Sequence, residues 1–345
     1  MLVKFWGVRG SIPTTPTQPI FQERLRAVLA LALERRLAPG GLDDFMVGLP
    51  ESMVTTVGGN TPCVEVLEGK SRLVIDAGTG LNALGQDLTA DSFPSDADKV
   101  RYFLENPSAL LDGAGSITFS KKKFRLSILL THTHWDHIQG FPFFAPVYHR
   151  GSVIDVYGQH EDKIRRHLTA QQASPELFPV DITRAGADVR FHTFPDAGLT
   201  LGPFRITSMD LPHPGGCLCF KIESKKKTAV FATDYEFAEN DPASDKAKKD
   251  LFQFIHNADV FISDTQYTFL ESMTKEGWGH SSPLRVAEMA LKAGVRKLFL
   301  FHHDPAYSDR KLFDMLQRTV AYTNLLSNGH AMEIKLAIEG QSVEI

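Results

Sequence analysis

Cysteine is scarce in this sequence, since only 3 of the 345 residues are cysteine, at positions 63, 217 and 219. So few thiols exclude a disulfide framework in a chain of this length. Cys217 and Cys219 alternate along an expected strand, where a small apolar side chain packs well, and we expect them in the core rather than on a metal. A reduced, cytoplasmic setting follows as an expectation.

Long hydrophobic runs and a strong charge of either sign are also missing. No run reaches the length of about eighteen apolar residues that a membrane span needs, and residues 1–7 contain no charged leader, so we expect a soluble protein without a membrane partner. The formal net charge is −4, which provides no overall attraction to nucleic acid. A polyanionic substrate would therefore have to be held by local cations or by metal ions.

Strand and helix patterns alternate in two rounds along the chain. Short apolar or alternating runs predict strands at residues 2–6, 63–67, 73–76, 124–130, 153–157, 189–194, 204–210, 218–222, 228–233, 260–263, 297–301 and 333–336. Helical periodicity appears at 161–169, 245–257, 282–293 and 309–324, with Ser281 and Asp309 as expected N-caps. Two β-rich halves flanked by helices predict an α/β fold, a four-layer αββα sandwich with its functional loops along one edge.

Two segments are predicted to be insertions into a single domain that spans residues 1–345. The first, at about 14–57, contains a strongly helical run at 21–36. It could be a lid over the site, a packing element between the subunits of a homodimer, or a helix that covers the core. The second, at about 88–123, is rich in Asp, Ser and Gly and is expected to be a surface excursion.

The run His132-Thr133-His134-Trp135-Asp136-His137 directly follows the apolar stretch at 124–130. In an extended backbone residues i and i+2 point the same way, whereas the turn that follows directs the last pair to a second position. One short loop could therefore supply ligands to two metal ions. A histidine-rich surface loop is the alternative, which this spacing and the distant histidines disfavour.

The later residues extend this motif in order and in strand context. They are His213 in Leu-Pro-His-Pro-Gly-Gly, Asp234 after the apolar run 230–233, and His302 after the apolar run 298–301. The whole pattern resembles the metallo-β-lactamase superfamily and covers nearly the whole chain apart from the two insertions. The resemblance implies a hydrolase with two divalent metal ions, held by His132, His134, His213, Asp136, His137 and His302, with Asp234 as a bridge between the ions.

Two choices at the metal site stay open. Imidazole and carboxylate ligands suit zinc, which we expect, and also manganese or iron, so the ligand types do not fix the metal. His302 and His303 are adjacent, and backbone alternation lets only one of them face the ions. Alignment with the proline three positions after His302 favours His302, which leaves His303 beside the site or facing the substrate.

A further motif points to the kind of reaction. Gly279-His280-Ser281-Ser282 precedes an expected helix, and Asp264 ends an expected strand. This resembles the ribonuclease Z-like phosphodiesterase branch of the superfamily, and it implies that His280 assists at the phosphate while Asp264 orients it. Ser282 stands where that branch has threonine. In the alternative reading His280 merely packs or caps at the start of the helix.

Three more residues are candidates for supporting roles. Asp76, after the apolar run 73–75, is expected to orient a metal-binding histidine. Asn60, in a Gly-Gly-Asn-Thr turn, could approach the substrate, although a turn role alone is favoured. Arg9, in a glycine-flanked loop, could pair with a phosphate, although an exposed arginine is the safer expectation.

These features together favour a metal-dependent phosphodiesterase that acts on a nucleotide, a cyclic nucleotide or another small phosphodiester. A hydroxide shared by the two ions would attack phosphorus, with Asp136 in proton transfer and His280 at the developing charge. Hydrolysis of an ester, thioester or lactone is the alternative, and a non-catalytic metal-binding scaffold is a third. Nucleic acid remains open as a partner, but residues 14–57 are not notably basic, which favours a small phosphorylated substrate over transfer RNA.

Overall fold

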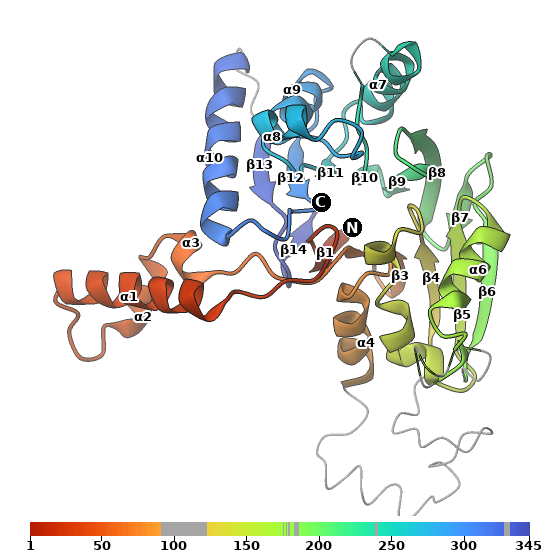
Figure 1. Ribbon diagram of the computed structural model, residues 1–345, viewed down its shortest axis with the longest axis horizontal. Helices are drawn as coiled ribbons and strands as arrows, with labels where there is room; N and C mark the ends of the chain where they lie inside the picture. Colours follow the sequence, from red (N-terminus) through yellow and green to blue (C-terminus); the bar gives the residue numbers. More distant parts are fainter. Residues whose placement is uncertain are drawn as a thin grey trace, which may run out of the picture.

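The computed structural model describes residues 1–90, 123–174, 176, 178, 180–182, 186–238, 241–327 and 332–345. Most of the expected surface excursion at 88–123 therefore lies outside the described residues. Within the described chain, two mixed sheets of seven strands each stand side by side, with helices on their outer faces (Figure 1). None of the described helices combines the length and the apolar character needed to cross a membrane.

The first sheet gathers strands from the N-terminal part of the chain and one from the C-terminus. Its spatial order is β14 (Ser342–Glu344), β1 (Leu2–Gly7), β2 (Cys63–Glu68), β3 (Ser71–Ile75), β4 (Arg125–Leu129), β5 (Val153–Gly158) and β6 (Asp188–Thr193). The strands from β3 to β6 run parallel, so their carboxyl ends lie at one edge of the sheet.

The second sheet contains the later strands. Its order is β13 (Glu333–Leu336), β12 (Lys297–Phe301), β11 (Val260–Asp264), β10 (Lys227–Ala232), β9 (Cys217–Ser224), β8 (Phe204–Leu211) and β7 (Leu199–Leu201). The four strands from β10 to β13 are parallel, whereas β7 to β10 form antiparallel pairs. Ligand sites in α/β folds form where the carboxyl ends of parallel strands meet, which selects this edge for the site.

A continuous apolar core joins the two sheets. The rings of Phe5 on β1 and Phe299 on β12 lie 5.2 Å apart, and both residues are fully or almost fully buried. The outer face of the second sheet is covered by α7 (Pro242–Phe254), α9 (Pro283–Lys292) and α10 (Asp309–Leu326). A second core lies between the first sheet and α4 (Gly80–Ala90) with α6 (Glu161–Ala170). The predicted αββα architecture is confirmed.

Both predicted N-caps differ by one residue from the observed ones. Ser282, not Ser281, is the N-cap of α9, and the hydroxyl of Ser281 instead donates to the carbonyl of Tyr235 at 2.7 Å. Ser308 caps α10 by accepting from the amide of Lys311, which leaves the carboxylate of Asp309 free to bind arginines. The helices α4 and α8 (Phe269–Thr274) and the strands β7 and β14 were not predicted from the sequence pattern. The two strands have three residues each, which is too few for recognisable alternation.

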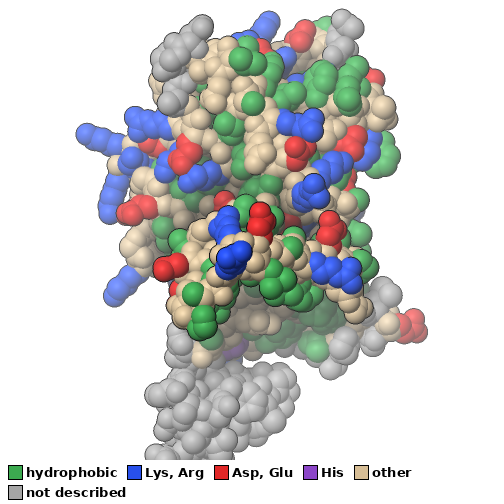
Figure 2. Space-filling model, turned by 90° about the vertical axis from the view of Figure 1, so that its left-hand side faces the viewer, with side chains coloured by type: hydrophobic (Ala, Val, Ile, Leu, Met, Phe, Trp, Pro, Cys, Tyr) green, Lys and Arg blue, Asp and Glu red, His purple; other side chains and the backbone are tan. Residues whose placement is uncertain are grey.

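The segment at 14–57 contains α1 (Gln18–Glu34), α2 (Leu42–Val47) and α3 (Glu51–Val54). These helices project from the body of the molecule (Figure 1), and α1 has no buried residue. Arg24 fastens α1 to the body through Asp309, at 2.7 Å, and the carbonyl of Thr55. Figure 2 shows the face from which this arm projects, where hydrophobic side chains are interspersed with charged ones.

Candidate metal centre

The predicted site residues follow strands of both sheets at one edge of the molecule. His132 to His137 lie in the loop after β4. Within this run, Trp135–His137 form a short 3-10 turn. Asp234 lies just after β10, and His302 directly follows β12. The edge therefore collects side chains that are far apart in the sequence.

Seven predicted ligands converge there in two adjacent groups. In each group one nitrogen or oxygen of every member lies within 4.8 Å of the others. The first group is His132, His134, His213 and Asp234, and the second is Asp136, His137 and His302. Asp234 also lies 3.3 Å from the Nε2 atoms of His137 and His302, so its carboxylate reaches both groups.

In three of these histidines Nδ1, the ring nitrogen that points away from the centre of the cluster, already forms a hydrogen bond. Nδ1 of His137 donates to Asp76 at 2.8 Å, Nδ1 of His302 to the side-chain oxygen of Gln266 at 2.9 Å, and Nδ1 of His213 to the carbonyl of Gly279 at 3.0 Å. A carboxylate or carbonyl on Nδ1 fixes the tautomer, so each Nε2 presents a lone pair to the centre of the cluster. Asp76 therefore lies where the sequence predicted an orienting group.

The positions of these Nε2 lone pairs suit the binding of a cation. Nε2 of His137 and Nε2 of His302 lie 3.2 Å apart, and two lone pairs at that distance repel unless a positive charge is shared between them. Nε2 of His132 is buried without a hydrogen-bond partner. Imidazole nitrogens with two carboxylates, Asp136 and Asp234, form a donor set that suits zinc, manganese or iron.

The protonation states of three ligands suit metal binding, whereas at His137 a bound cation would have to displace a proton. Burial lowers the pKa of His137, but the neighbouring carboxylates outweigh it and raise this pKa well above its usual value. Burial lowers the pKa of His132 well below its usual range and that of His213 to about 4, so both imidazoles are neutral at pH 7. Burial opposes the ionisation of Asp234, but His302, His137 and His132 outweigh it and hold its pKa well below the usual value. Neutral imidazole and ionised carboxylate are the forms that bind divalent ions.

Three residues of the site have a left-handed backbone. The φ angles of Asp76, Asp234 and His302 are 60°, 53° and 61°, and each follows the end of a strand. Residues other than glycine seldom adopt this conformation, which costs roughly 1–3 kcal/mol each. The left-handed backbone conformation at each of these residues directs its side chain away from the strand and into the cluster.

His280 and Asp264 form a pair beside the cluster. Nδ1 of His280 lies 2.8 Å from Oδ2 of Asp264, and the His280 ring stacks on that of His302 at 5.1 Å. Burial lowers the pKa of His280, but the carboxylates of Asp264, Asp234 and Asp136 outweigh it and raise this pKa to about 9. Gly279 is required next to this pair, because its φ is 83° and a Cβ there would lie 2.2 Å from Nδ1 of His213.

The expectations for two neighbouring residues, Arg9 and His303, were wrong, whereas Asn60 lies as expected. Arg9 is neither exposed nor directed at the site, because it is 4% exposed and donates to the carbonyls of Gly58 and Tyr307. His303 is buried with Nε2 on the carbonyl of Ala337, so His302 is the member of the pair that faces the cluster. Asn60 has the favoured turn role, since its amide groups bind the carboxylate of Glu339.

Two contacts of the cluster were not predicted. The backbone amide of Ser11 donates to Oδ2 of Asp136 at 2.7 Å, and Gln266 binds His302 as described above. Ser11 has a φ of 65°, so the Gly10-Ser11 turn presents its amide to the site. The glycine before Ser11 was the only signal in the sequence, and a glycine alone does not say which amide will be exposed.

Comparison with known proteins agrees with this geometry. The sequence profile of the Beta-lactamase superfamily domain matches residues 125–303, just over half of the chain. The chain belongs to this superfamily, and the resemblance predicted from its motifs is confirmed.

Individual relatives are more distant. Ribonuclease Z of Picrophilus torridus is 44% identical over 64 residues, which cover 18% of this chain and 20% of the relative. The probable metallo-hydrolase YhfI of Bacillus subtilis is 26% identical over 176 residues, 51% of this chain and 65% of the relative. Both matches span less than two thirds of the relatives' own length.

Solved structures share the fold over the whole chain. The metallo-β-lactamase fold protein YhfI from Bacillus subtilis superposes with a TM-score of 0.55 at 19% identity, covering 100% of this chain and 99% of that chain. The short form of human tRNase Z gives a TM-score of 0.53 at 15% identity, with coverage of 100% and 99%. At this level of identity the likeness concerns the fold alone.

Proposed function

We propose that this hydrolase is a phosphodiesterase that acts on a nucleotide, a cyclic nucleotide or another small phosphodiester with two divalent metal ions. The observation that carries the proposal is the contact of His280 with Asp264 beside the metal-type cluster. Polarising a carbonyl needs only the cluster, whereas a departing alkoxide of a phosphodiester benefits from a positioned acid. The similarity to proteins named ribonuclease Z supports the same reading.

The ions would be held by the seven residues of the two groups and, when bound, would neutralise phosphate charge and lower the pKa of water. His280 supplies the proton. With Nδ1 on Asp264, its Nε2–H is the free donor, and a pKa of about 9 keeps it protonated at pH 7. Proton transfer in this arrangement typically contributes about 10²–10⁴-fold.

Asp136 is the proposed proton acceptor. One of its oxygens accepts from the amide of Ser11 and lies 3.4 Å from Nε2 of His137, which fixes the carboxylate at the cluster. His134 is exposed, so the cluster is open to solvent on that side.

Hydrolysis of bis(p-nitrophenyl) phosphate tests the proposal. We expect metal-dependent turnover by the parent. With a cyclic nucleotide, whose leaving group is an alkoxide, we expect a loss of about 10²–10⁴-fold in kcat for His280→Ala, with the metal content unchanged. His256→Ala is the matched control, because His256 is an exposed histidine outside the cluster. Turnover of the cyclic nucleotide by His280→Ala at the parent rate, or a parent that hydrolyses thioesters or lactones but no diester, would refute the assignment.

A further inference from the structure

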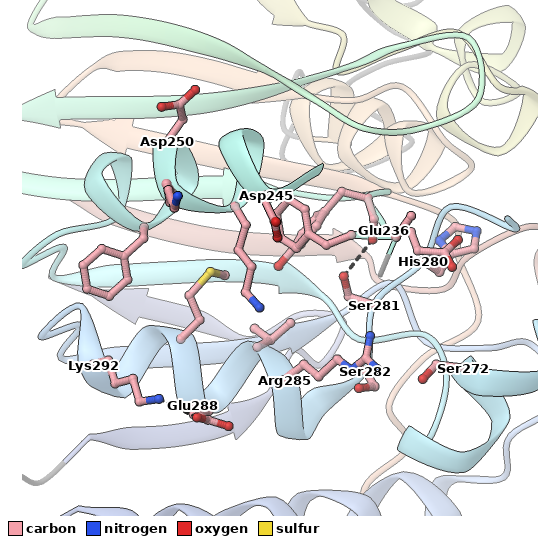
Figure 3. Close-up of a pocket in the computed structure, with 18 of the residues that line it drawn as sticks. Glu236, Asp245, Asp250, Ser272, His280, Ser281, Ser282, Arg285, Glu288 and Lys292 are labelled. Carbon is pink, nitrogen blue, oxygen red and sulfur yellow. Dashed lines mark hydrogen bonds and ion pairs between the residues drawn. The ribbon is translucent and has the colours of Figure 1, made fainter. Parts of the chain in front are cut away.

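A groove of about 990 Å³ runs between α7 and α9 and has His280 among its lining residues. Figure 3 shows His280 at one end of the groove, with Glu288 and Lys292 toward the other and Asp245 between them. His280 therefore belongs both to the groove and to the candidate site. Its volume lies at the upper end of the range of about 300–1,000 Å³ that is usual for small-molecule sites.

Most of the charges that line the groove are compensated within the protein. Glu288 pairs with Lys292, Asp250 pairs with Lys246 at 2.8 Å, and Glu236 accepts from the amides of Gly277 and Gly279. These groups give little attraction to a charged ligand, because each carboxylate already has a donor.

Besides Arg285, whose guanidinium carbon lies 5.4 Å from the ring centre of Phe269, two cations and one carboxylate remain. Lys248 and Lys249 are exposed and form no ion pair or hydrogen bond with any described residue, and the same holds for the carboxylate of Asp245. The uncompensated charge of the lining is therefore positive. The apolar part of the lining includes Phe237 and Phe252, whose rings are half-buried and provide faces on which an aromatic ring can stack.

We infer that this groove binds the leaving group of the diester, and that this leaving group is a nucleoside carrying a further phosphate. The inference rests on the proposed function, because a leaving oxygen protonated by His280 lies on the His280 side of the reacting phosphate. The nucleoside then lies against the apolar lining, and its own phosphate reaches Lys248 and Lys249. Aromatic stacking together with a lysine contact to phosphate is a common way to hold a nucleotide.

Binding of uncleavable dinucleoside phosphorothioates tests this assignment independently of turnover. The probes carry no terminal phosphate, a 5′-phosphate or a 3′-phosphate. We expect one of the two terminal phosphates to tighten binding to the metal-loaded parent by about tenfold, the order expected from two exposed charge contacts. The double variant Lys248→Ala, Lys249→Ala should lose that gain and show a weaker salt dependence.

Lys70→Ala is the control, because Lys70 is exposed like Lys248 and Lys249 but lies in the turn between β2 and β3 and does not line the groove. This control variant should still bind the probe with the terminal phosphate more tightly than the probe without it. The inference is overturned if neither terminal phosphate tightens binding, or if the gain persists in the double variant. Failure of the proposed function has a different signature, since the parent would then fail to cleave bis(p-nitrophenyl) phosphate whatever its affinity for the phosphorothioates.

Discussion

The Nε2 atoms of His137 and His302 lie 3.2 Å apart, although the two residues follow strands of different sheets. His137 lies after β4 of the first sheet, and His302 directly follows β12 of the second. A cation bound by both would hold the two sheets together at this edge. Metal binding should therefore stabilise the fold as well as enable the reaction.

Chelation of the metal should destabilise the protein. A ligand that binds only the folded state at 1,000 times its Kd adds about 4 kcal/mol to the free energy of unfolding. We expect EDTA treatment to lower the urea midpoint, and we expect readdition of zinc, manganese or iron to restore it. Equal midpoints with and without metal would show that the cluster does not hold a cation between the sheets.

Asp76→Asn should weaken metal binding. Asp76 accepts from Nδ1 of His137 and also from the amide and hydroxyl of Thr131, all within the buried core. An amide can present its NH₂ group to Nδ1, which would shift the proton of His137 to Nε2 and block that ligand. Loss of such a carboxylate typically costs about 10–100-fold in metal affinity.

Competition with a metal-binding dye measures that affinity. Asp155→Asn is the control, because Asp155 makes a similar 2.9 Å contact to His192 away from the cluster. The control should bind metal as the parent does. An Asp76→Asn protein with parent affinity would remove Asp76 from its orienting role.

The cluster was predictable because its signals are local. His132 to His137 follow an apolar strand within a few residues, and Asp234 and His302 each follow another such strand. Strand ends of a layered α/β fold meet at one edge, so residue type and strand context together indicate proximity. Asp264 was predictable for the same reason, since it is the last residue of β11.

The surroundings of the cluster were not predictable, because they depend on contacts between distant segments. Arg9 is flanked by glycines, which suggests a surface loop, but its guanidinium is enclosed by segments about 50 and 300 residues away in sequence. His303 and His302 are identical in type, and only the backbone angle at His302 decides which ring enters the cluster. The periodicity of apolar residues in the sequence predicts neither the burial of Arg9 nor which of the two histidines enters the cluster.

Asp264→Asn should shift the pH dependence of activity. Asp264 is the largest of the influences that raise the pKa of His280 to about 9 against the effect of burial. Removing its charge lowers the pKa of His280, so the protonated acid is lost at a lower pH. The alkaline limb of the kcat profile should therefore move to lower pH, with the metal content unchanged. An unchanged alkaline limb with reduced kcat would mean that His280 is not the titrating acid.

Arg9→Met should destabilise the fold without a specific effect on catalysis. The side chain of Arg9 is 4% exposed, and its loss would leave Asp309 with Arg24 as its one remaining arginine and the buried carbonyls of Gly58 and Tyr307 without their donor. A buried polar group left without its partner typically costs about 1–3 kcal/mol. Arg24→Ala is the control, because Arg24 pairs with the same carboxylate but is 22% exposed, and solvent screens part of its interaction, so its loss should destabilise the fold less. Urea unfolding separates the two variants, and steady-state kinetics of the folded Arg9→Met protein should give the parent KM. A strongly raised KM with parent stability would instead place Arg9 on the substrate phosphate.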